Sequence, residues 1–246
     1  MKRSEIDALI DNEIVFFNST GFSLPPQAYW SFSDWVENAD KVRELRERGC
    51  GWDLTDFGSG NYSKIGLLLY TLSNGIKSNP SSQSYANKYL FIGEGQVTPM
   101  HHHWDKMEDI INLSGGVLQI KVFNVGIRDS IDSASPVSIL VNNIMVTFLA
   151  GSIIELSPGE RVLLKQNHYH SFWAKKGFGR VLAEEVSMVN DDANDNCFLP
   201  EDKIGRFPMI EEDSKPKHLL CNELPGTKGF EKLKKKYLSQ RAGTPA

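Results

Sequence analysis

Cysteine is scarce in this sequence. The 246 residues include three cysteines, Cys50, Cys197 and Cys221, which lie far apart along the chain. This number and spacing match neither a disulfide framework nor the paired cysteines of a zinc ribbon. We therefore expect a protein of a reducing compartment.

Long apolar runs and an excess of basic charge are also missing. No apolar stretch approaches the roughly 18 residues that a membrane-spanning helix needs. The first 17 residues are charged and amphipathic, without the continuous apolar centre of a secretory signal. The net charge is −4, and the one basic run, Lys232–Lys236, is short. We expect a cytoplasmic protein that binds neither nucleic acid nor membrane.

Helical patterns occur towards the two ends of the chain, over residues 4–18, 33–48 and 228–240. Residues 51–58 are interpreted as a turn-rich crossing, and the acidic stretch 188–196 as a surface loop over the mouth of a barrel. Between these lie short strand-like segments at regular intervals: 65–72, 88–92, 117–123, 138–141, 145–149, 152–156, 161–164, 168–173 and 180–187. Many short strands separated by turn residues are typical of a β-sandwich or β-barrel.

The most informative stretch runs from Gly95 to Gly115 and contains His101, His103 and Glu108. Side chains two residues apart on a strand point to the same side, so the two histidines can share one metal ion. The five-residue step to Glu108 breaks this alternation, so the chain must turn between His103 and Glu108. Two imidazoles and one carboxylate then face a common point, a ligand set that suits a divalent transition metal.

This spacing resembles the first motif of the cupin superfamily, whose small double-stranded β-barrel holds a metal through His, His, Glu and a later His. The resemblance implies a mainly β jelly-roll barrel with helical additions at both ends, and a second motif about two strands downstream. Gly159–His170 has the spacing of that motif, although Lys165 and Asn167 replace the usual Pro and Gly. Asn tolerates the left-handed turn that Gly normally provides. The implied metal ligands are His101, His103, Glu108 and His170.

Two other histidines compete with this assignment. His168 has the same strand parity as His170, and the count from Gly159 favours His170. His102 alternates with its neighbours, so we expect it to be exposed or to lie behind the ligands. A run of histidines is also typical of a purification tag, but this run lies in mid-chain between strand-like segments. Three imidazoles and a carboxylate accept manganese, iron, cobalt or zinc.

Several further stretches resemble one family, the cupin-type D-lyxose ketol-isomerases. The resemblance covers about residues 1–225 and is carried by Gly51–Gly58, His103–Asn112, Tyr169–Trp173, Glu185–Asp192 and Gly205–Pro208. It implies a metal-dependent enzyme that interconverts D-lyxose and D-xylulose, with manganese as the usual ion. D-mannose and D-fructose are implied as possible related substrates.

The remaining polar residues suggest roles in that reaction. Moving a proton between C2 and C1 of an open-chain sugar passes through an enediolate, and a nearby carboxylate can carry the proton. Glu185 is our hypothesis for this base. Glu184 stays open, because strand alternation without a known register cannot say which of the two adjacent glutamates faces inward. Glu211 also stays open as a base. A hydride shift also stays open. Further expected residues are Lys106 as a catalytic group, and Lys88, Arg206, Glu211 and Trp104 as sugar contacts.

The sequence argues against two other functions. An iron-dependent cupin dioxygenase would have an apolar site without lysine, and Lys88 and Lys106 weigh against it. A sugar-binding regulator would carry a basic helix-turn-helix, for which neither terminal region is suited.

We expect residues 1–50 to form a helical extension packed on the barrel, 51–225 the barrel domain and 226–246 a helix and tail. A homodimer is expected by analogy with the fold.

Overall fold

The structure, a computed structural model, describes residues 1–199 and 207–238. The chain divides into two compact units. One comprises Met1–Asp53 together with the chain from Met209 onward, and the other comprises Leu54–Pro208. The expected boundaries at residues 50 and 225, and the packing of the helices on the barrel, remain predictions. Among the described residues, no helix is long and apolar enough to span a membrane.

The first unit is helical. The helix predicted over residues 4–18 is confirmed as α1 (Arg3–Ser19), which buries Ile6, Ile10 and Phe17. The other elements are η1 (Pro26–Tyr29), α2 (Phe32–Glu37), η2 (Ala39–Lys41), α3 (Arg43–Glu47), η4 (Cys221–Glu223) and α4 (Lys228–Leu238). α4 confirms the predicted terminal helix, whose last two residues lie outside the described residues.

The single helix expected over residues 33–48 is wrong. The chain forms α2, η2 and α3 in succession, and Asn38 and Val42 lie between them with non-helical dihedral angles. The side-chain amide of Asn38 donates to the carbonyl of Asp34 at 2.9 Å. Asn competes for backbone hydrogen bonds in this way, which favours helix ends over helix interiors.

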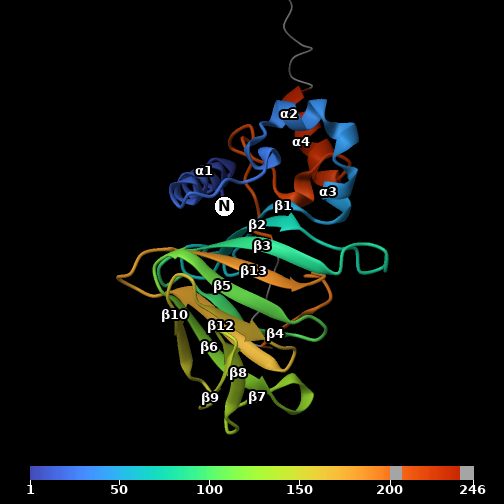
Figure 1. Ribbon diagram of the computed structural model, residues 1–246. Coiled ribbons are helices and arrows are strands. Elements are labelled where there is room, and N and C mark those ends of the chain that lie inside the picture. The colour runs from blue at the N-terminus through green and yellow to red at the C-terminus, as the bar shows by residue number, and fades with distance from the viewer. Residues whose placement is uncertain (200–206, 239–246) are drawn as a thin grey trace, which may run out of the picture. The chain divides into compact units, whose positions relative to one another are not determined.

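The second unit consists of two curled antiparallel sheets (Figure 1). The larger sheet runs in the order β2-β3-β13-β5-β11-β8-β9, and the smaller in the order β10-β6-β12-β4-β14, with β7 paired to β6. The strands are β2 (Leu67–Ser73), β3 (Tyr85–Ile92), β4 (Thr98–His103), β5 (Glu108–Gly115), β6 (Leu118–Val125), β7 (Ile131–Asp132), β8 (Val137–Val141), β9 (Ile144–Phe148), β10 (Ile153–Leu156), β11 (Arg161–Leu164), β12 (His168–Ala174), β13 (Val181–Met188) and β14 (Asn196–Phe198). The predicted mainly β, jelly-roll fold class is confirmed.

One further strand, β1 (Gly51–Thr55), occupies part of the expected turn-rich crossing. All five of its residues are buried. Burial overrides the weak strand propensity of Gly51 and Asp53, since strand preference depends strongly on packing context. The crossing interpretation was therefore wrong for these residues.

The barrel core is aliphatic and comes from both sheets. Leu90 and Ile110 of the larger sheet and Ile120 and Val122 of the smaller sheet belong to one buried cluster. Burying each such side chain contributes about 1.5–3 kcal/mol. The cluster includes Ile110 of β5 and Phe172 of β12, so these two strands carry their polar side chains on a packed scaffold.

Candidate active site

Four side chains meet between the two sheets of the barrel. His101 and His103 lie on β4, His170 lies on β12, and Glu108 is the first residue of β5. One ligand atom from each lies within 4.8 Å of the others, and all four residues are buried. The antiparallel pairing of β4 and β12 places His101 directly opposite His170. The structure therefore brings together the full set of expected ligands in a cluster that could hold a divalent metal.

The three imidazoles are oriented by backbone carbonyls. The Nδ1 atoms of His101, His103 and His170 lie 2.8, 3.0 and 3.2 Å from the carbonyl oxygens of Pro99, Asp195 and His168 respectively. A carbonyl only accepts, so each Nδ1 carries the hydrogen and each Nε2 keeps a lone pair. This is the arrangement in which metal-binding histidines are usually held.

The Nε2 atoms face the carboxylate of Glu108. Nε2 of His170 lies 3.0 Å from Oε1 of Glu108, and Nε2 of His103 lies 3.4 Å from Oε2. Two acceptors at this distance repel each other unless a proton or a cation lies between them. The donor set therefore fits a divalent transition metal.

A second polar cluster adjoins the first. Nζ of Lys106 lies 2.9 Å from Oε1 of Glu185 and 3.0 Å from Oε2 of Glu108. Nζ of Lys88 lies 3.2 Å from the same Oε1 of Glu185. Lys106 therefore joins the metal-ligand cluster to a second carboxylate.

Burial and charge act in opposite directions on these groups. Burial raises the pKa of Glu108, but the charge of Lys106 outweighs it and holds that pKa well below its usual range. Burial also raises the pKa of Glu185, and Lys106 and Lys88 again outweigh it, so this pKa is lowered. Burial lowers the pKa of Lys106, whereas Glu108 and Glu185 raise it above its usual value. Both carboxylates are therefore ionised and Lys106 is charged at neutral pH.

The strand register separates Glu184 from Glu185. β13 pairs with β3 so that Glu185 lies opposite Lys88, and Glu185 is buried. Glu184 points to the other face, where it accepts a hydrogen bond of 2.8 Å from Asn87. Of the two adjacent glutamates, Glu185 is the one that joins the cluster.

The two competing histidines lie outside the cluster. His168 is buried at the start of β12, and burial together with His170 lowers its pKa to about 4. His102 points to the opposite face of β4, but it is buried against Tyr169 rather than exposed, with ring centroids 4.6 Å apart.

The left-handed turn considered for Asn167 is not formed. Among the described residues, Asn167 is not one with a positive φ, so that explanation for the replacement of Gly was wrong.

The other three residues expected to contact the sugar, Arg206, Glu211 and Trp104, are not part of this polar cluster as the structure describes it. Arg206 lies outside the described residues. Glu211 belongs to the first unit, where its backbone bonds with Met1 and Arg3 at 2.9 Å each. Trp104 is 49% exposed, and its ring lies 5.8 Å from that of His102. Their roles stay predictions.

The loop between β13 and β14 contributes Asp195, a residue for which the sequence predicts no role. It was expected to be a surface loop, but Asp195 is 2% exposed. Its carboxylate accepts hydrogen bonds from the backbone N–H groups of Asp105 and Lys106 at 2.6 and 3.1 Å. No local spacing signals this role, because about 90 positions separate the partners.

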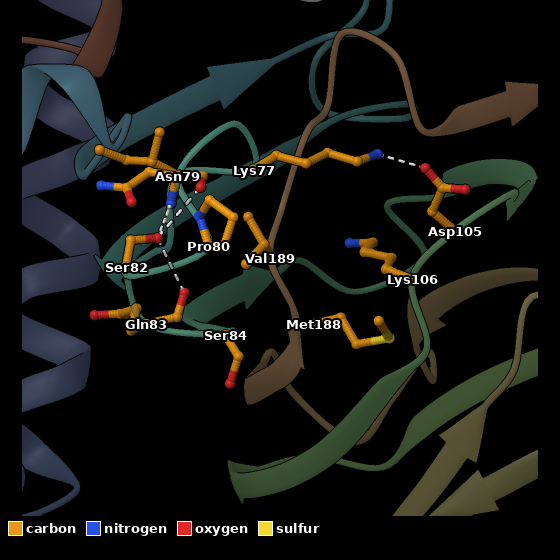
Figure 2. Close-up of a pocket in the computed structure, with 11 residues that line it drawn as sticks. Lys77, Asn79, Pro80, Ser82, Gln83, Ser84, Asp105, Lys106, Met188 and Val189 are labelled. Carbon is orange, nitrogen blue, oxygen red and sulfur yellow. Dashed lines mark hydrogen bonds and ion pairs between the residues drawn. The ribbon is translucent and has the colours of Figure 1, made fainter.

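A cavity of about 290 Å³ lies beside Lys106. Figure 2 shows Lys106 and Met188 towards one side of it, residues from Asn79 to Ser84 towards the other, and Val189 between them. An ion pair between Lys77 and Asp105 crosses its edge. None of the four candidate metal ligands lines this cavity, but Lys106, whose ammonium contacts Glu108, does.

Comparison with known proteins points to one family. A family model described as D-lyxose isomerase matches residues 1–224. The chain is 41% identical over 225 residues to a D-lyxose/D-mannose isomerase of Serratia proteamaculans, covering 91% of this chain and 97% of that protein. It is 40% identical over 225 residues to a D-lyxose/D-mannose isomerase of Escherichia coli O157:H7, covering 91% and 98%.

Solved structures show the same fold at lower identity. The L-ribose isomerase of Cellulomonas parahominis with L-psicose has a TM-score of 0.58 and 15% identity, covering 86% of this chain and 98% of that chain. The L-ribose isomerase of Geodermatophilus obscurus has a TM-score of 0.59 and 14% identity at the same coverage. Because the family model spans nearly the whole described chain and the curated relatives are at least 40% identical, this chain belongs to the D-lyxose isomerase family.

Proposed function

We propose that this sugar isomerase interconverts D-lyxose and D-xylulose, and also accepts D-mannose and D-fructose. The proposal rests on one observation above all. The four candidate metal ligands lie in the interior of the same barrel as Glu185 and two lysines. Lys106 contacts the carboxylates of both Glu108 and Glu185. The names of the curated relatives support the choice of sugars.

The metal would be held by His101, His103, Glu108 and His170. Manganese is our proposal, because the carboxylate ligand favours the harder ions over the softer ones, with iron, cobalt and zinc as alternatives. When bound, a divalent ion acts as a Lewis acid that lowers the cost of negative charge on neighbouring sugar oxygens by several kcal/mol.

Glu185 is the proposed proton carrier. It is ionised, buried and held between two ammonium groups, so it can take the proton from C2 of an open-chain aldose and return it to C1. A positioned base of this kind typically contributes about 10²–10⁴ in rate. The enediolate intermediate carries its negative charge on the oxygens of C1 and C2.

Lys106 and Lys88 are proposed to stabilise that charge. Their ammonium groups are buried, and buried donors aimed at developing charge are worth more than donors in water. Two such lysines inside the barrel also disfavour the dioxygenase alternative. The homodimer and the cytoplasmic location stay predictions.

The test is direct. The full-length protein is stripped of metal, reconstituted with Mn²⁺ and incubated separately with D-lyxose, D-mannose, D-xylose and L-ribose, and ketose formation is measured. We expect the highest turnover with D-lyxose. Turnover of D-lyxose no faster than that of D-xylose and L-ribose would contradict the proposed substrate, and no turnover of any sugar would contradict the proposed function.

A further inference from the structure

One side chain accepts hydrogen bonds from both lysines of the site. Oδ1 of Asn190 lies 2.6 Å from Nζ of Lys88 and 3.2 Å from Nζ of Lys106. An ammonium group only donates, so the amide oxygen and not the amide nitrogen must face the lysines. Asn190 lies just beyond β13, five residues after Glu185. It thus supplies a neutral acceptor next to the carboxylate that both lysines contact.

The backbone of Asn190 is held in turn by Asn74. Nδ2 of Asn74 donates to the carbonyl oxygen of Asn190 at 3.1 Å, and the N–H of Asn190 donates to Oδ1 of Asn74 at 2.9 Å. Asn74 is 6% exposed. Two opposed hydrogen bonds from one buried carboxamide fix both backbone polar groups of Asn190. The backbone from which the side chain of Asn190 reaches the lysines is therefore held in place.

The cavity beside Lys106 makes these hydrogen bonds important. Figure 2 shows that the wall of the cavity includes Lys106, Met188 and Val189, the last of which directly precedes Asn190. On the side of a cavity, a side chain lacks the van der Waals contacts that hold a residue in a packed core. The polar contacts of the Lys106 ammonium are with Asn190, Glu108 and Glu185, and these contacts fix its position on the side that faces the cavity.

Charge alone does not define one position for the lysines. Lys106 faces the carboxylates of Glu108 and Glu185, and Lys88 faces Glu185 and, at 3.7 Å, Asp192. Coulombic attraction has no strong directional preference, so each ammonium can shift between neighbouring carboxylates. A fixed amide oxygen in reach of both nitrogens selects one arrangement.

We propose that Asn190, held by Asn74, is a positioning residue that keeps the ammonium groups of Lys88 and Lys106 on Glu185. This inference rests on the proposed function, because the placement matters for proton transfer at Glu185. Among the described residues, Asn190 forms its hydrogen bonds with Lys88, Lys106 and Asn74, none of which is a candidate metal ligand. Its removal should therefore change the rate of the reaction without changing the affinity for metal.

The experiment is a double-mutant cycle in the full-length protein with Asn74→Ala, Asn190→Ala and the double variant. Asn79→Ala is the matched control, because Asn79 is an exposed residue of the cavity-lining loop whose side chain bonds within that loop. For each variant, kcat and KM for D-lyxose are measured with saturating Mn²⁺. The affinity of the metal-free protein for Mn²⁺ is measured by titration, and folding by thermal unfolding.

We expect Asn190→Ala to lower kcat by roughly tenfold to a hundredfold, the range for a small misplacement of catalytic groups. KM and the affinity for Mn²⁺ should change by less than about threefold, which is small compared with the decrease in kcat. Asn74→Ala should lower kcat less, and should have no further effect once Asn190 is already Ala, because it acts through that side chain. Asn79→Ala should match the wild type.

Four results overturn the inference. The first is an unchanged kcat in Asn190→Ala, and the second is a loss of Mn²⁺ affinity or thermal stability in parallel with kcat, which indicates a general structural role. The third is strict additivity of Asn74→Ala and Asn190→Ala, which shows that Asn74 does not act through Asn190. The fourth is a wild type that is inactive on every sugar, which overturns the proposed function together with this inference. An active wild type with unaffected variants overturns this inference alone.

Discussion

Nζ of Lys106 lies 2.9 Å from Oε1 of Glu185, although 79 positions separate the two residues along the chain. The same nitrogen lies 3.0 Å from Oε2 of Glu108, one of the candidate metal ligands. A buried ammonium thus stands between the metal-ligand cluster and the proposed proton carrier. Each carboxylate is kept ionised by a charge that also holds the other in place.

Replacing the proposed base tests its role most directly. Glu185→Gln keeps the size of the side chain and removes the proton acceptor, so kcat for D-lyxose should fall by about 10²–10⁴. Because Glu185 is not in the ligand cluster, Mn²⁺ affinity should stay within about threefold of the wild type, well short of the loss seen when a ligand shell is disturbed. The measurements are steady-state kinetics and Mn²⁺ titration. Near-normal turnover would move the base to another residue, with Glu211 next to be tested.

The two mechanisms for hydrogen transfer are distinguished by solvent exchange. A carboxylate that carries the proton exchanges it with water in some turnovers, so sugar recovered from D₂O should contain deuterium at C1 or C2. A hydride shift moves hydrogen directly between the two carbons and leaves both free of solvent deuterium. Mass spectrometry of the recovered ketose and aldose decides between them.

The choice between two neighbouring histidines can be checked with a matched pair. His170→Gln removes a member of the cluster and should weaken Mn²⁺ binding by more than about tenfold, since loss of even an outer-shell partner typically costs 10–100-fold. His168→Gln removes an imidazole outside the cluster and should retain affinity close to that of the wild type. Both are measured by Mn²⁺ titration of the metal-free protein. Equal losses in the two variants would be inconsistent with the ligand assignment.

Lys106 should also matter for stability. Lys106→Met leaves Glu108 and Glu185 buried with less positive charge, and breaking a buried ion pair costs about 3–5 kcal/mol. The free energy of unfolding of the metal-free protein should fall by this amount in urea titrations, and less when Mn²⁺ is bound. Lys77→Met is the control, because its pair with Asp105 is exposed and should cost no more than about 1 kcal/mol. A stable metal-free Lys106→Met would show that the carboxylates do not depend on this ammonium.

The pH dependence of stability follows from the histidines. Burial, with repulsion from His170 and His103, holds the pKa of His101 well below its usual value, and burial also lowers the pKa of His103. The unfolded chain therefore binds more protons below about pH 6.5, and the unfolding free energy of the metal-free protein should decrease as pH falls from about 7.5 to 5.5. Each histidine contributes at most about 1.4 kcal/mol per pH unit.

The buried carboxylates lie outside that window. The lowered pKa values of Glu108 and Glu185 give stability that is fully present above the unfolded value of about 4.3 and is lost only as pH falls further. His101→Gln should accordingly reduce the slope between pH 7.5 and 5.5. A slope that is unchanged in this variant would contradict the assignment of the pH dependence to the ligand histidines.

The sequence by itself predicted the four residues of the candidate metal site, which the structure brings together. Alternation along a strand is a local property, so His101 and His103 could be placed on one side of β4 from their spacing, and the resemblance to a known motif added Glu108 and His170. The mainly β fold was predictable for the same reason, because strands and turns are marked locally. The helix broken at Asn38 is a segment in which local preferences compete closely, whereas β1 was misjudged because burial overrides its weak strand propensity.

Only the tertiary structure decided which residues surround the ligands. Alternation says that Glu184 and Glu185 face opposite sides, but the pairing of β13 with β3 decides that Glu185 faces Lys88. Asn190 and Asp195 are separated from their partners by 84 to 116 positions of chain, and no spacing in the sequence encodes such contacts. Their roles arise from closure of the barrel, which brings distant backbone segments within hydrogen-bond reach of one another.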